Sequence, residues 1–358
     1  GLLDADAESR QATFGAGTRL ADTGAPLQQI GQGMFNLPDI DRQTLAGATA
    51  TSTHGTGIEF HSLSGYITGM QMVTASGDVI EADLESDPDF LKAASVGIGA
   101  LGIVTKIRMQ NRGAYRLKKN EWVEKTEDVL KNFDERVAGH RHVEMFPLVH
   151  SDYALVLSID ESEEPIDNPG PDPEADAAFA MAMRAWMKLP PGMRSPLING
   201  LASQIEPSSA VDVSYKILTN IRNNRFNEME YSVPLDQGAA CLREVLTTIA
   251  EQEIDVVFPL EYRYIKGDDL LLSMFEGGPR AAISIHRTWD EDYRPYFDII
   301  EPIFRKYGGR PHWGKLHTLG YAELTKLYPG FEDFRTLRAE LDPQGRLLND
   351  HMRKVFDV

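Results

Sequence analysis

The chain has 358 residues, 42% hydrophobic and 25% charged, which is typical of a globular protein large enough for more than one domain. Lys and Arg number 36 and Asp and Glu 54, and the resulting net charge of −18 argues against nucleic acid as a partner. The single cysteine, Cys241, excludes a disulfide within the chain and a cluster of thiolate metal ligands.

The sequence gives little indication of a membrane segment. It has no run of about 18 apolar residues, so we expect no transmembrane helix. The first residues, GLLDADAESR, lack the basic and then apolar pattern of a signal peptide and resemble the middle of a domain. We expect the protein to be cytoplasmic or peripherally associated with a membrane.

The first 115 residues alternate apolar and polar side chains over short runs separated by glycine turns, which predicts strands. One strand is expected at 11–16. The stretch 64–84 predicts a hairpin that turns at Ser76-Gly77-Asp78. Another strand, at 101–109, follows the glycine-rich turn 97–102.

After Gly113 helices become frequent. The spacing of Val123, Val129 and Phe133 predicts an amphipathic helix over 120–138. Strands are expected at 142–158, 210–216, 230–235, 254–264 and 280–288, and helices at 235–252, 291–306 and 322–340. Because strand, helix and strand follow each other twice, we expect a sheet covered by helices on one face.

An acidic, proline-rich insertion at about 160–200 interrupts this pattern. Its first half is expected to be a solvated loop. The apolar piece at 177–187 predicts a helix that packs on its own domain, or else forms a homodimer contact, a membrane contact or a docking surface for a partner.

Small and hydroxyl residues run without interruption from Ala46 to Gly57. Such a loop lets a ligand approach the backbone and leaves N–H groups free to bind it, which suits a pyrophosphate or the edge of a ring. A purely structural turn is the alternative. The loop is neither a dinucleotide-binding fingerprint nor a P-loop, because no GxGxxG opens a helix and no Gly-Lys-Ser/Thr follows.

Charged residues in the second half form three further groups. Glu261 and Arg263 are two apart in an apolar strand and therefore share a face, either as a structural ion pair or as a site. His286 and Thr288 share a face at the end of the strand 280–288. The segment 310–317 brings Lys315 together with two histidines and a tryptophan, and it is either a surface loop or a site for a developing anion.

Two other kinds of site are not expected. His140, His142 and His150 have spacing suited to one strand face, but no carboxylate–histidine pattern completes a set of four metal ligands. A serine nucleophile would need a G-x-S-x-G turn, and the sequence has none.

Five motifs occur here in one order: Thr-His-Gly-Thr-Gly, Gly-Ala-Leu-Gly-Ile-Val-Thr, Glu-x-Arg, Gly-Gly-Arg-Pro-His-Trp-Gly-Lys and Leu-Asp-Pro-Gln-Gly-Arg-Leu-Leu-Asn. Together they resemble the sugar-lactone oxidases of the vanillyl-alcohol-oxidase flavoprotein superfamily, a group that includes gulonolactone and arabinonolactone oxidases and alditol oxidase. The resemblance implies an α+β fold with a split, strand-rich FAD-binding domain of the vanillyl-alcohol-oxidase (PCMH) type and a cap domain with a helix-covered antiparallel sheet. We expect the FAD-binding part at 1–115, the cap with the acidic insertion at 116–320, and C-terminal helices returning to the FAD domain at 321–358.

The resemblance also implies roles for individual residues. It implies FAD as cofactor, and the residues that correspond to the family's flavin site are Pro38, Thr44, Gly47, Thr51, Ser52, Thr53, His54, Gly55, Ile103 and His312. In the family a further flavin loop, whose His often bonds covalently to FAD, precedes this region, and we expect it upstream of Gly1. The residues that correspond to the family's substrate site are Glu261, Arg263, Lys315 and Asp39. His286 and Thr288 correspond to two further substrate-site residues of alditol oxidase.

The implied reaction is oxidation of a CH–OH group in an aldono-1,4-lactone by hydride transfer to flavin N5. Arg263 and Lys315 would stabilise the developing alkoxide, and Glu261 would orient hydroxyls or accept the proton. Oxidation of an alditol is the alternative, and a flavin-free binding or assembly protein is the alternative from another class. Pro38 lies where the family gates oxygen, so we expect oxygen as acceptor, with a quinone or cytochrome as the other possibility. Asp39 departs from the Ser or Gly of several relatives.

Overall fold

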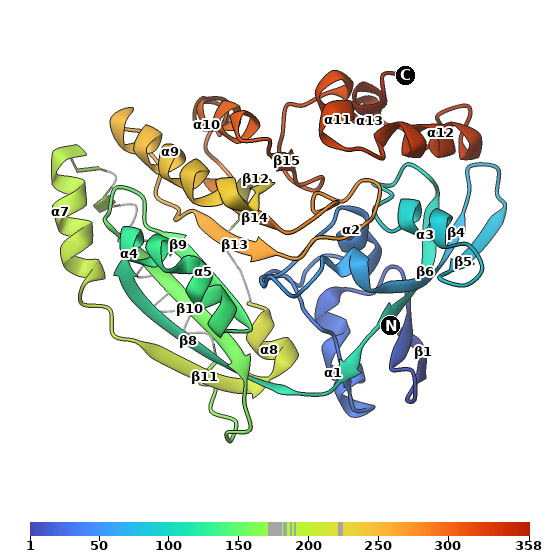
Figure 1. The fold of residues 1–358 in the computed structure, drawn as a ribbon, viewed down its shortest axis with the longest axis horizontal. Helices are drawn as coiled ribbons and strands as arrows, with labels where there is room; N and C mark the ends of the chain where they lie inside the picture. Colours follow the sequence, from blue (N-terminus) through green and yellow to red (C-terminus); the bar gives the residue numbers. More distant parts are fainter. Residues whose placement is uncertain (171–180, 182–184, 187, 190, 221–224) are drawn as a thin grey trace.

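The computed structural model describes residues 1–170, 181, 185–186, 188–189, 191–220 and 225–358. Two large antiparallel sheets dominate it, and Figure 1 shows them side by side. The five-stranded sheet has the order β1 (Leu2–Asp6), β2 (Gln11–Gly15), β6 (Ile103–Gln110), β4 (Ile67–Val73) and β5 (Val79–Asp83). The eight-stranded sheet has the order β11 (Ser208–Val213), β8 (Arg116–Lys125), β10 (Tyr153–Glu161), β9 (His142–Pro147), β13 (Glu261–Ile265), β14 (Arg280–Thr288), β12 (Phe226–Pro234) and β15 (Arg310–Pro311).

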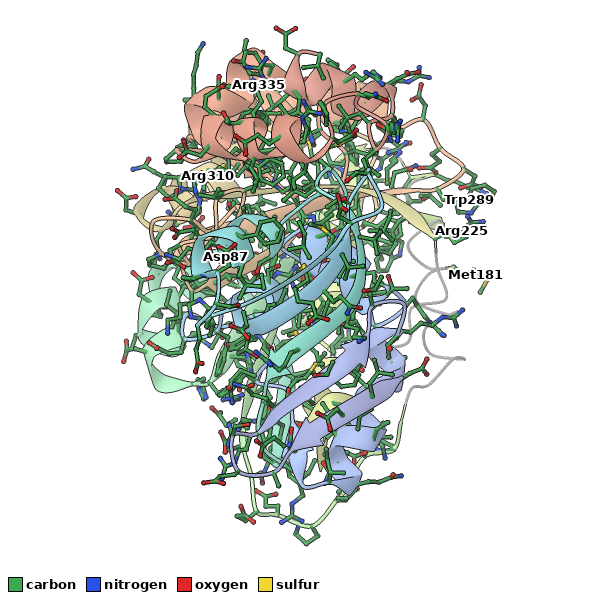
Figure 2. The ribbon with its side chains drawn as sticks, turned by 90° about the vertical axis from the view of Figure 1, so that its right-hand side faces the viewer. Asp87, Met181, Arg225, Trp289, Arg310 and Arg335 are labelled. Carbon is green, nitrogen blue, oxygen red and sulfur yellow. The ribbon has the colours of Figure 1, made fainter. Side chains whose placement is uncertain are left out.

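Short elements connect and cover the sheets. β3 (Gln32–Gly33) and β7 (Arg112–Gly113) form a small two-stranded sheet. The first half contains η1 (Leu20–Asp22), α1 (Gly24–Gln29), α2 (Leu45–Ala50), η2 (Leu63–Tyr66) and α3 (Pro88–Ala94). The second half contains α4 (Thr126–Lys131), α5 (Phe133–Gly139), α7 (Pro191–Ala202), α8 (Ser214–Leu218), η3 (Leu235–Gln237), α9 (Gly238–Glu251), α10 (Arg294–Lys306), α11 (Tyr321–Leu327), α12 (Phe331–Leu341) and α13 (Asp350–Phe356). In Figure 2 the C-terminal helices, marked by Arg335, form one end of the molecule.

The helix-covered antiparallel sheet is confirmed. In Figure 1, α4, α5, α9 and α10 lie over one face of the eight-stranded sheet. Tyr262 and Tyr264 of β13 pack on Phe133 of α5, each with ring centroids 4.9 Å apart, and Tyr231 of β12 stacks on Phe304 of α10 at 5.2 Å. Since successive side chains of a strand point to opposite faces, the residues between these tyrosines face away from the helices.

Several predicted elements are also confirmed. The hairpin expected at 64–84 forms as β4 and β5, and the strands expected at 11–16, 101–109 and 280–288 form as β2, β6 and β14. One hydrophobic cluster runs through both sheets, from Phe14 and Ile107 to Tyr262. The boundaries 1–115, 116–320 and 321–358 stay a prediction.

The helix predicted over 120–138 is wrong in its first part. Residues up to Lys125 belong to β8, and the helices begin only at Thr126. β8 pairs with β10 on one side and with β11 on the other. Its charged sequence, RLKKNEWVEK, gives a weak strand signal, and pairing on both edges outweighs it.

Two strand predictions need shorter bounds. The strand expected at 254–264 begins only at Glu261, because Pro259 has no N–H to donate to a ladder. The strand expected at 210–216 ends at Val213, where α8 begins. Most of the helix expected at 177–187 lies outside the described residues. Of its described residues, Trp186 packs on a small cluster with Leu148 and Ile198.

Candidate functional site

A group of charged side chains occupies the face of the eight-stranded sheet that the helices leave uncovered. The strand register places Arg263 of β13 opposite Glu144 of β9, and Glu228 of β12 opposite His286 of β14. Ser284 of β14 lies between Glu261 on one side and Glu230 on the other. Directly opposed residues are close enough to interact, so the register itself assembles this cluster.

Arg263 lies at the centre of the cluster and is buried. Its Nη1 lies 2.8 Å from Glu261 Oε1 and 3.1 Å from Glu144 Oε1, and its Nη2 lies 3.4 Å from Glu230 Oε2. Burial alone would lower the pKa of Arg263, but the surrounding carboxylates raise it, so the guanidinium stays charged. The ion pair expected for Glu261 and Arg263 is therefore present, within a larger network.

Lys315 reaches the cluster from the loop that follows β15. Backbone bonds hold this loop on β12, from His312 N to Glu230 O and from Leu316 N to Glu228 O. As a result Lys315 Nζ lies 2.5 Å from Glu228 Oε1 and also contacts Glu230 Oε2. The structure thus brings together the three charged residues that the sequence proposed, Glu261, Arg263 and Lys315.

Glu230 is the most shared carboxylate of this network. Besides Arg263 and Lys315, it accepts hydrogen bonds from Ser284 Oγ at 2.7 Å and pairs with His54 Nε2 at 2.6 Å. Burial works to raise the pKa of Glu230, but Lys315, His54 and Arg263 outweigh it and hold that pKa well below its usual range. Burial likewise opposes ionisation of Glu228, and there Lys315 and His286 hold the pKa below its usual range. Both side chains are therefore carboxylates.

Glu144 differs from these two carboxylates. Burial and the nearby charge of Glu261 raise the pKa of Glu144 to about 7, although Arg263 and the Thr56 hydroxyl act in the opposite direction. At neutral pH this side chain is therefore distributed between the acid and the carboxylate.

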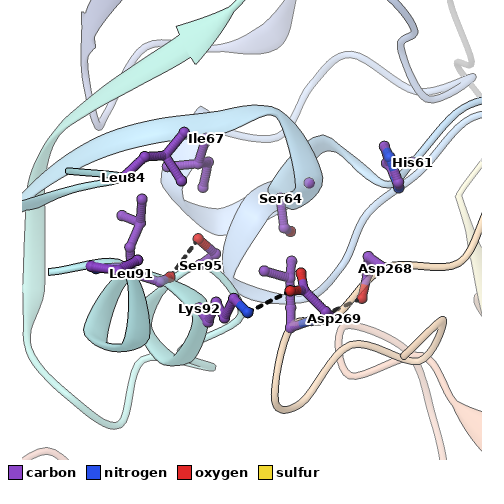
Figure 3. Close-up of a pocket in the computed structure, with 12 residues that line it drawn as sticks. His61, Ser64, Ile67, Leu84, Leu91, Lys92, Ser95, Asp268 and Asp269 are labelled. Carbon is purple, nitrogen blue, oxygen red and sulfur yellow. Dashed lines mark hydrogen bonds and ion pairs between the residues drawn. The ribbon is translucent and has the colours of Figure 1, made fainter. Parts of the chain in front are cut away.

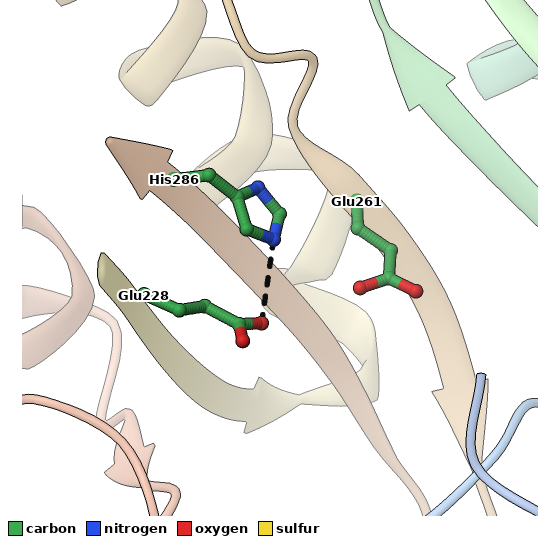
Figure 4. Close-up of side chains that lie close together, drawn as sticks. All are labelled: Glu228, Glu261 and His286. Carbon is green, nitrogen blue, oxygen red and sulfur yellow. Dashed lines mark ion pairs between the residues drawn. The ribbon is translucent and has the colours of Figure 1, made fainter. Parts of the chain in front are cut away.

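His286 and Thr288 lie toward the end of β14 on the same face as Ser284. His286 Nε2 lies 3.3 Å from Glu228 Oε1, as Figure 4 shows. One ligand atom each of Glu228, Glu261 and His286 lies within 4.8 Å of the others. Because Lys315 and Arg263 already neutralise the two carboxylates, we assign no metal to this trio. Thr288 is half-buried, and none of the described charged groups pairs with its side chain.

Two of the predicted flavin segments of the first half, 36–39 and 54–57, form one wall. Asn36 Nδ2 donates to Thr56 O at 2.9 Å, and a Cβ on Gly55 would lie 2.3 Å from Leu37 O, so the segments 36–39 and 54–57 are in direct contact. Pro38 is buried in this wall. Only a residue without a side chain fits at position 55.

The same wall meets the Lys315 loop. A Cβ on Gly314 would lie 3.2 Å from Thr51 Oγ1, and the rings of His54 and His312 are 5.9 Å apart. His312 is buried; burial lowers its pKa to about 3, and its Nδ1 accepts from Gly314 N–H, so the ring is neutral.

The loop 51–57 fits a bound cofactor. Ser52 Oγ is buried without a partner, and Thr53, His54, Gly55 and Thr56 are all buried. Within the described part of the chain, nothing accepts a hydrogen bond from the N–H groups of residues 54–56. Buried N–H groups normally have partners, so the donors of this loop suit acceptor atoms of a ligand such as FAD.

Other predicted residues have different surroundings. Thr44 caps α2, accepting from Gly47 N–H at 3.2 Å, so both residues shape the start of that helix. Thr51 and Thr53 contact each other through their hydroxyls at 3.3 Å. Ile103 begins β6 and is 60% exposed, away from the charged cluster.

Asp39 lies next to the cluster. Its Oδ1 accepts from Asn220 Nδ2 at 2.5 Å, and its charge contributes to the raised pKa of Glu144. The three histidines considered as metal ligands bond elsewhere: His140 to Asp160, His142 to Thr56 O, and His150 to Ile254 O.

A cavity of about 230 Å³ lies outside the charged cluster, between α3, η2 and the segment 268–270. Lys92 and Asp269 form an ion pair of 2.5 Å at its wall, which Figure 3 shows. Burial raises the pKa of the neighbouring Asp268 to about 6. None of the charged groups that contact Arg263 or Lys315 lines this cavity.

Sequence reasoning missed three carboxyls of the cluster: Glu144, Glu228 and Glu230. A signal for them existed, because Glu144 and Glu230 each lie in a strand between two apolar or aromatic residues, and Glu228 shares a face with Glu230. Buried carboxylates need partners, so this pattern indicates a cationic neighbour but does not identify it.

This fold defines a class of protein: an FAD-binding flavoprotein with a large, helix-covered antiparallel sheet. Its fold is similar to that of cholesterol oxidase from Brevibacterium sterolicum, with a TM-score of 0.80 at 15% identity over 99% of this chain and 83% of the other. A family described as FAD binding domain matches residues 1–83, and the D-arabinono-1,4-lactone oxidase family matches residues 107–355.

Relatives along the whole chain agree with these matches. The chain is 33% identical to an L-gulono-1,4-lactone dehydrogenase of Mycobacterium tuberculosis, over 99% of this chain and 83% of the relative. It is 26% identical to an L-gulonolactone oxidase of Scyliorhinus torazame and 24% identical to an alditol oxidase of a Streptomyces species, with the same coverage. The chain belongs to the D-arabinono-1,4-lactone oxidase family and is an FAD-dependent oxidoreductase.

Proposed function

We propose that this protein oxidises a CH–OH group of an aldono-1,4-lactone. The observation that carries the proposal is the convergence of Glu261, Arg263 and Lys315 on one sheet face beside the loop 51–57. The relatives named as lactone dehydrogenase and lactone oxidase support this substrate class. Sugar lactones carry several hydroxyls and no charge, which suits a site rich in charged hydrogen-bonding groups.

Arg263 and Lys315 can stabilise the negative charge that develops on the substrate during oxidation. As a hydride leaves carbon, negative charge develops on the hydroxyl oxygen, and fixed cations in a site closed to water stabilise it more strongly than water does. Arg263 and Lys315 are held by carboxylates and need not reorganise at that moment. Glu261, with 10% of its side chain exposed, can orient the remaining hydroxyls.

The backbone donors of residues 54–56, the Ser52 hydroxyl and the neutral ring of His312 would hold FAD. When bound, FAD supplies the acceptor for the hydride at its N5 atom. Pro38 corresponds to the position that gates oxygen in the family, which supports oxygen as the acceptor of the second half-reaction. The acidic Asp39 departs from the lactone oxidases, so a quinone or cytochrome is the alternative acceptor. No helix in the described part of the chain is long and apolar enough to cross a membrane.

The experiment is anaerobic mixing of the FAD-loaded protein with a panel of aldonolactones and alditols, following the loss of flavin absorbance. We expect rapid bleaching with at least one aldonolactone. Bleaching by alditols alone would instead support alditol oxidation, for which the alditol oxidase relative and the His286–Glu228 pair provide a basis. A flavin that no lactone reduces would contradict the proposal. Peroxide formed on readmitting air would support oxygen as acceptor.

A further inference from the structure

Glu144 is a carboxyl of the charged cluster with no role in the proposed reaction as described above. It is a buried residue of β9, opposite Arg263 in the register. Its Oε1 lies 3.1 Å from Arg263 Nη1, and Glu261 Oε1 lies 2.8 Å from the same nitrogen. The two side chains retain 11% and 10% exposure. A hydroxyl bound by Glu261 is therefore within reach of Glu144.

The charges around Glu144 leave it the least compensated carboxyl of the four in the cluster. Glu228 and Glu230 both contact Lys315, and Glu261 has the shorter contact to Arg263. Of the two cations in the cluster, Glu144 contacts only Arg263, and Arg263 also contacts Glu261 and Glu230.

The charged and polar groups that face Glu144 come from three segments other than its own strand. They are Glu261 and Arg263 of β13, the carboxylate of Asp39, and the hydroxyl of Thr56, which donates to Glu144 Oε1. His142, two residues earlier on β9, bonds to Thr56 O rather than to Glu144. Two carboxylates and a single shared cation thus surround the group, which favours uptake of a proton by Glu144. The raised pKa of about 7 agrees with this arrangement.

We propose that Glu144 is a further catalytic residue, whose carboxylate accepts the hydroxyl proton of the substrate. This inference rests on the proposed function. The C–H and O–H bonds break and a C=O double bond forms; the hydrogen on carbon leaves with both electrons to the flavin, and the proton passes to Glu144. Arg263 stabilises the oxygen during the step, and Glu261 orients the substrate.

The alternative is that Glu144 only positions Arg263, and the pH dependence separates the two roles. A general base acts when deprotonated, so the rate of flavin reduction by L-gulono-1,4-lactone should rise about tenfold per pH unit below an apparent pKa near 7. Glu144→Gln keeps the size of the side chain, and it should lose this rise and react roughly 10²–10⁴ times more slowly. Glu144→Asp should restore the rise with a lower rate. A Glu144→Gln variant that retains the rise would overturn the proposal.

A second measurement does not depend on turnover. Because the folded state binds the Glu144 proton more tightly than the unfolded chain does, this residue stabilises the fold most at low pH. That stabilisation is lost as the pH rises from about 4.5 to about 7. Thermal unfolding of Glu144→Gln should therefore depend less on pH in this window than that of the wild type. An unchanged dependence would mean that Glu144 does not titrate there, and would overturn the proposal.

Asp268→Asn provides the matched control. Asp268 is a buried carboxyl with a raised pKa at the cavity of Figure 3, outside the charged cluster. Its replacement should alter the pH dependence of unfolding and leave the pH dependence of flavin reduction unchanged. If the lactones and alditols fail to reduce the wild type at every pH, the proposed function fails, and the catalytic role of Glu144 fails with it. The unfolding measurement then still decides whether Glu144 titrates near pH 7.

Discussion

Replacing Glu230 by Gln would remove a buried negative charge that Arg263 and Lys315 share. The Glu230 side chain has no exposure, and its two oxygens contact Arg263, Lys315, His54 and Ser284. Gln has the same shape but no charge, so the substitution tests the charge rather than the packing. The NH₂ group of Gln cannot accept hydrogen bonds, so it would face the donors of the neighbouring side chains without bonding to them.

The magnitude follows from the cost of leaving buried charge uncompensated. Removing one partner of a buried ion pair costs about 3–5 kcal/mol of unfolding free energy. Unfolding entropy is about 2.1 cal/mol/K per residue, or roughly 0.75 kcal/mol/K for 358 residues. We therefore expect the unfolding midpoint to fall by about 4–7 °C. Displacement of the two cations by as little as 1 Å would slow flavin reduction about 100-fold.

The assay combines calorimetry with anaerobic stopped-flow reduction of the flavin. Glu301→Gln is the matched control, because Glu301 is also buried but accepts from the Tyr231 hydroxyl and Thr318 N–H rather than from a cation. We expect Glu301→Gln to lose about 1–3 kcal/mol of stability and to reduce its flavin at the wild-type rate. A Glu230→Gln protein with the wild-type midpoint and rate would refute the idea that Glu230 holds the two cations in place.

Three further outcomes are expected. Lys315→Met should slow flavin reduction by about 10²–10³, as loss of an oxyanion donor does. The control Lys306→Met, at an exposed lysine, should leave the rate unchanged. Equal stopped-flow rates for the two variants would show that Lys315 has no part in the mechanism. Gly55→Ala should lose FAD, because its Cβ would lie 2.3 Å from Leu37 O; full flavin absorbance after gel filtration would contradict this. Burial raises the pKa of Asp268 to about 6, so its contribution to stability should be lost as the pH rises from about 4 to 6; calorimetry should show a flatter profile for Asp268→Asn, and an unchanged profile would count against the shift.

Local sequence patterns predicted much of the second sheet. The strand expected at 280–288 forms as β14, and the helices expected at 235–252 and 291–306 form for the most part as α9 and α10. Alternation also predicted that Glu261 and Arg263 share a face. These features depend on residues a few positions apart, so the sequence alone indicates them.

The strand β8 could not be predicted in this way, whereas Pro259 in the sequence does indicate the late start of β13. β8 is stable as a strand because β10 and β11 pair with both of its edges, and neither partner is recognisable from the sequence of β8 itself. Tertiary pairing overrides local propensity in such cases.

The sequence by itself determined the family resemblance, the residue types of the site and the face on which Glu261 and Arg263 lie. Only the tertiary structure decided which groups meet there. Glu144 lies 119 positions before Arg263, and Glu230 lies 85 positions before Lys315. Glu144, Arg263 and Glu230 come together because the strand order β9-β13-β14-β12 places their positions on one face in register, and Lys315 joins them because its loop is bonded to β12. That order is a property of the whole sheet, since pairs such as β9 with β13 and β12 with β15 join strands that are distant in the chain, and no local pattern encodes them.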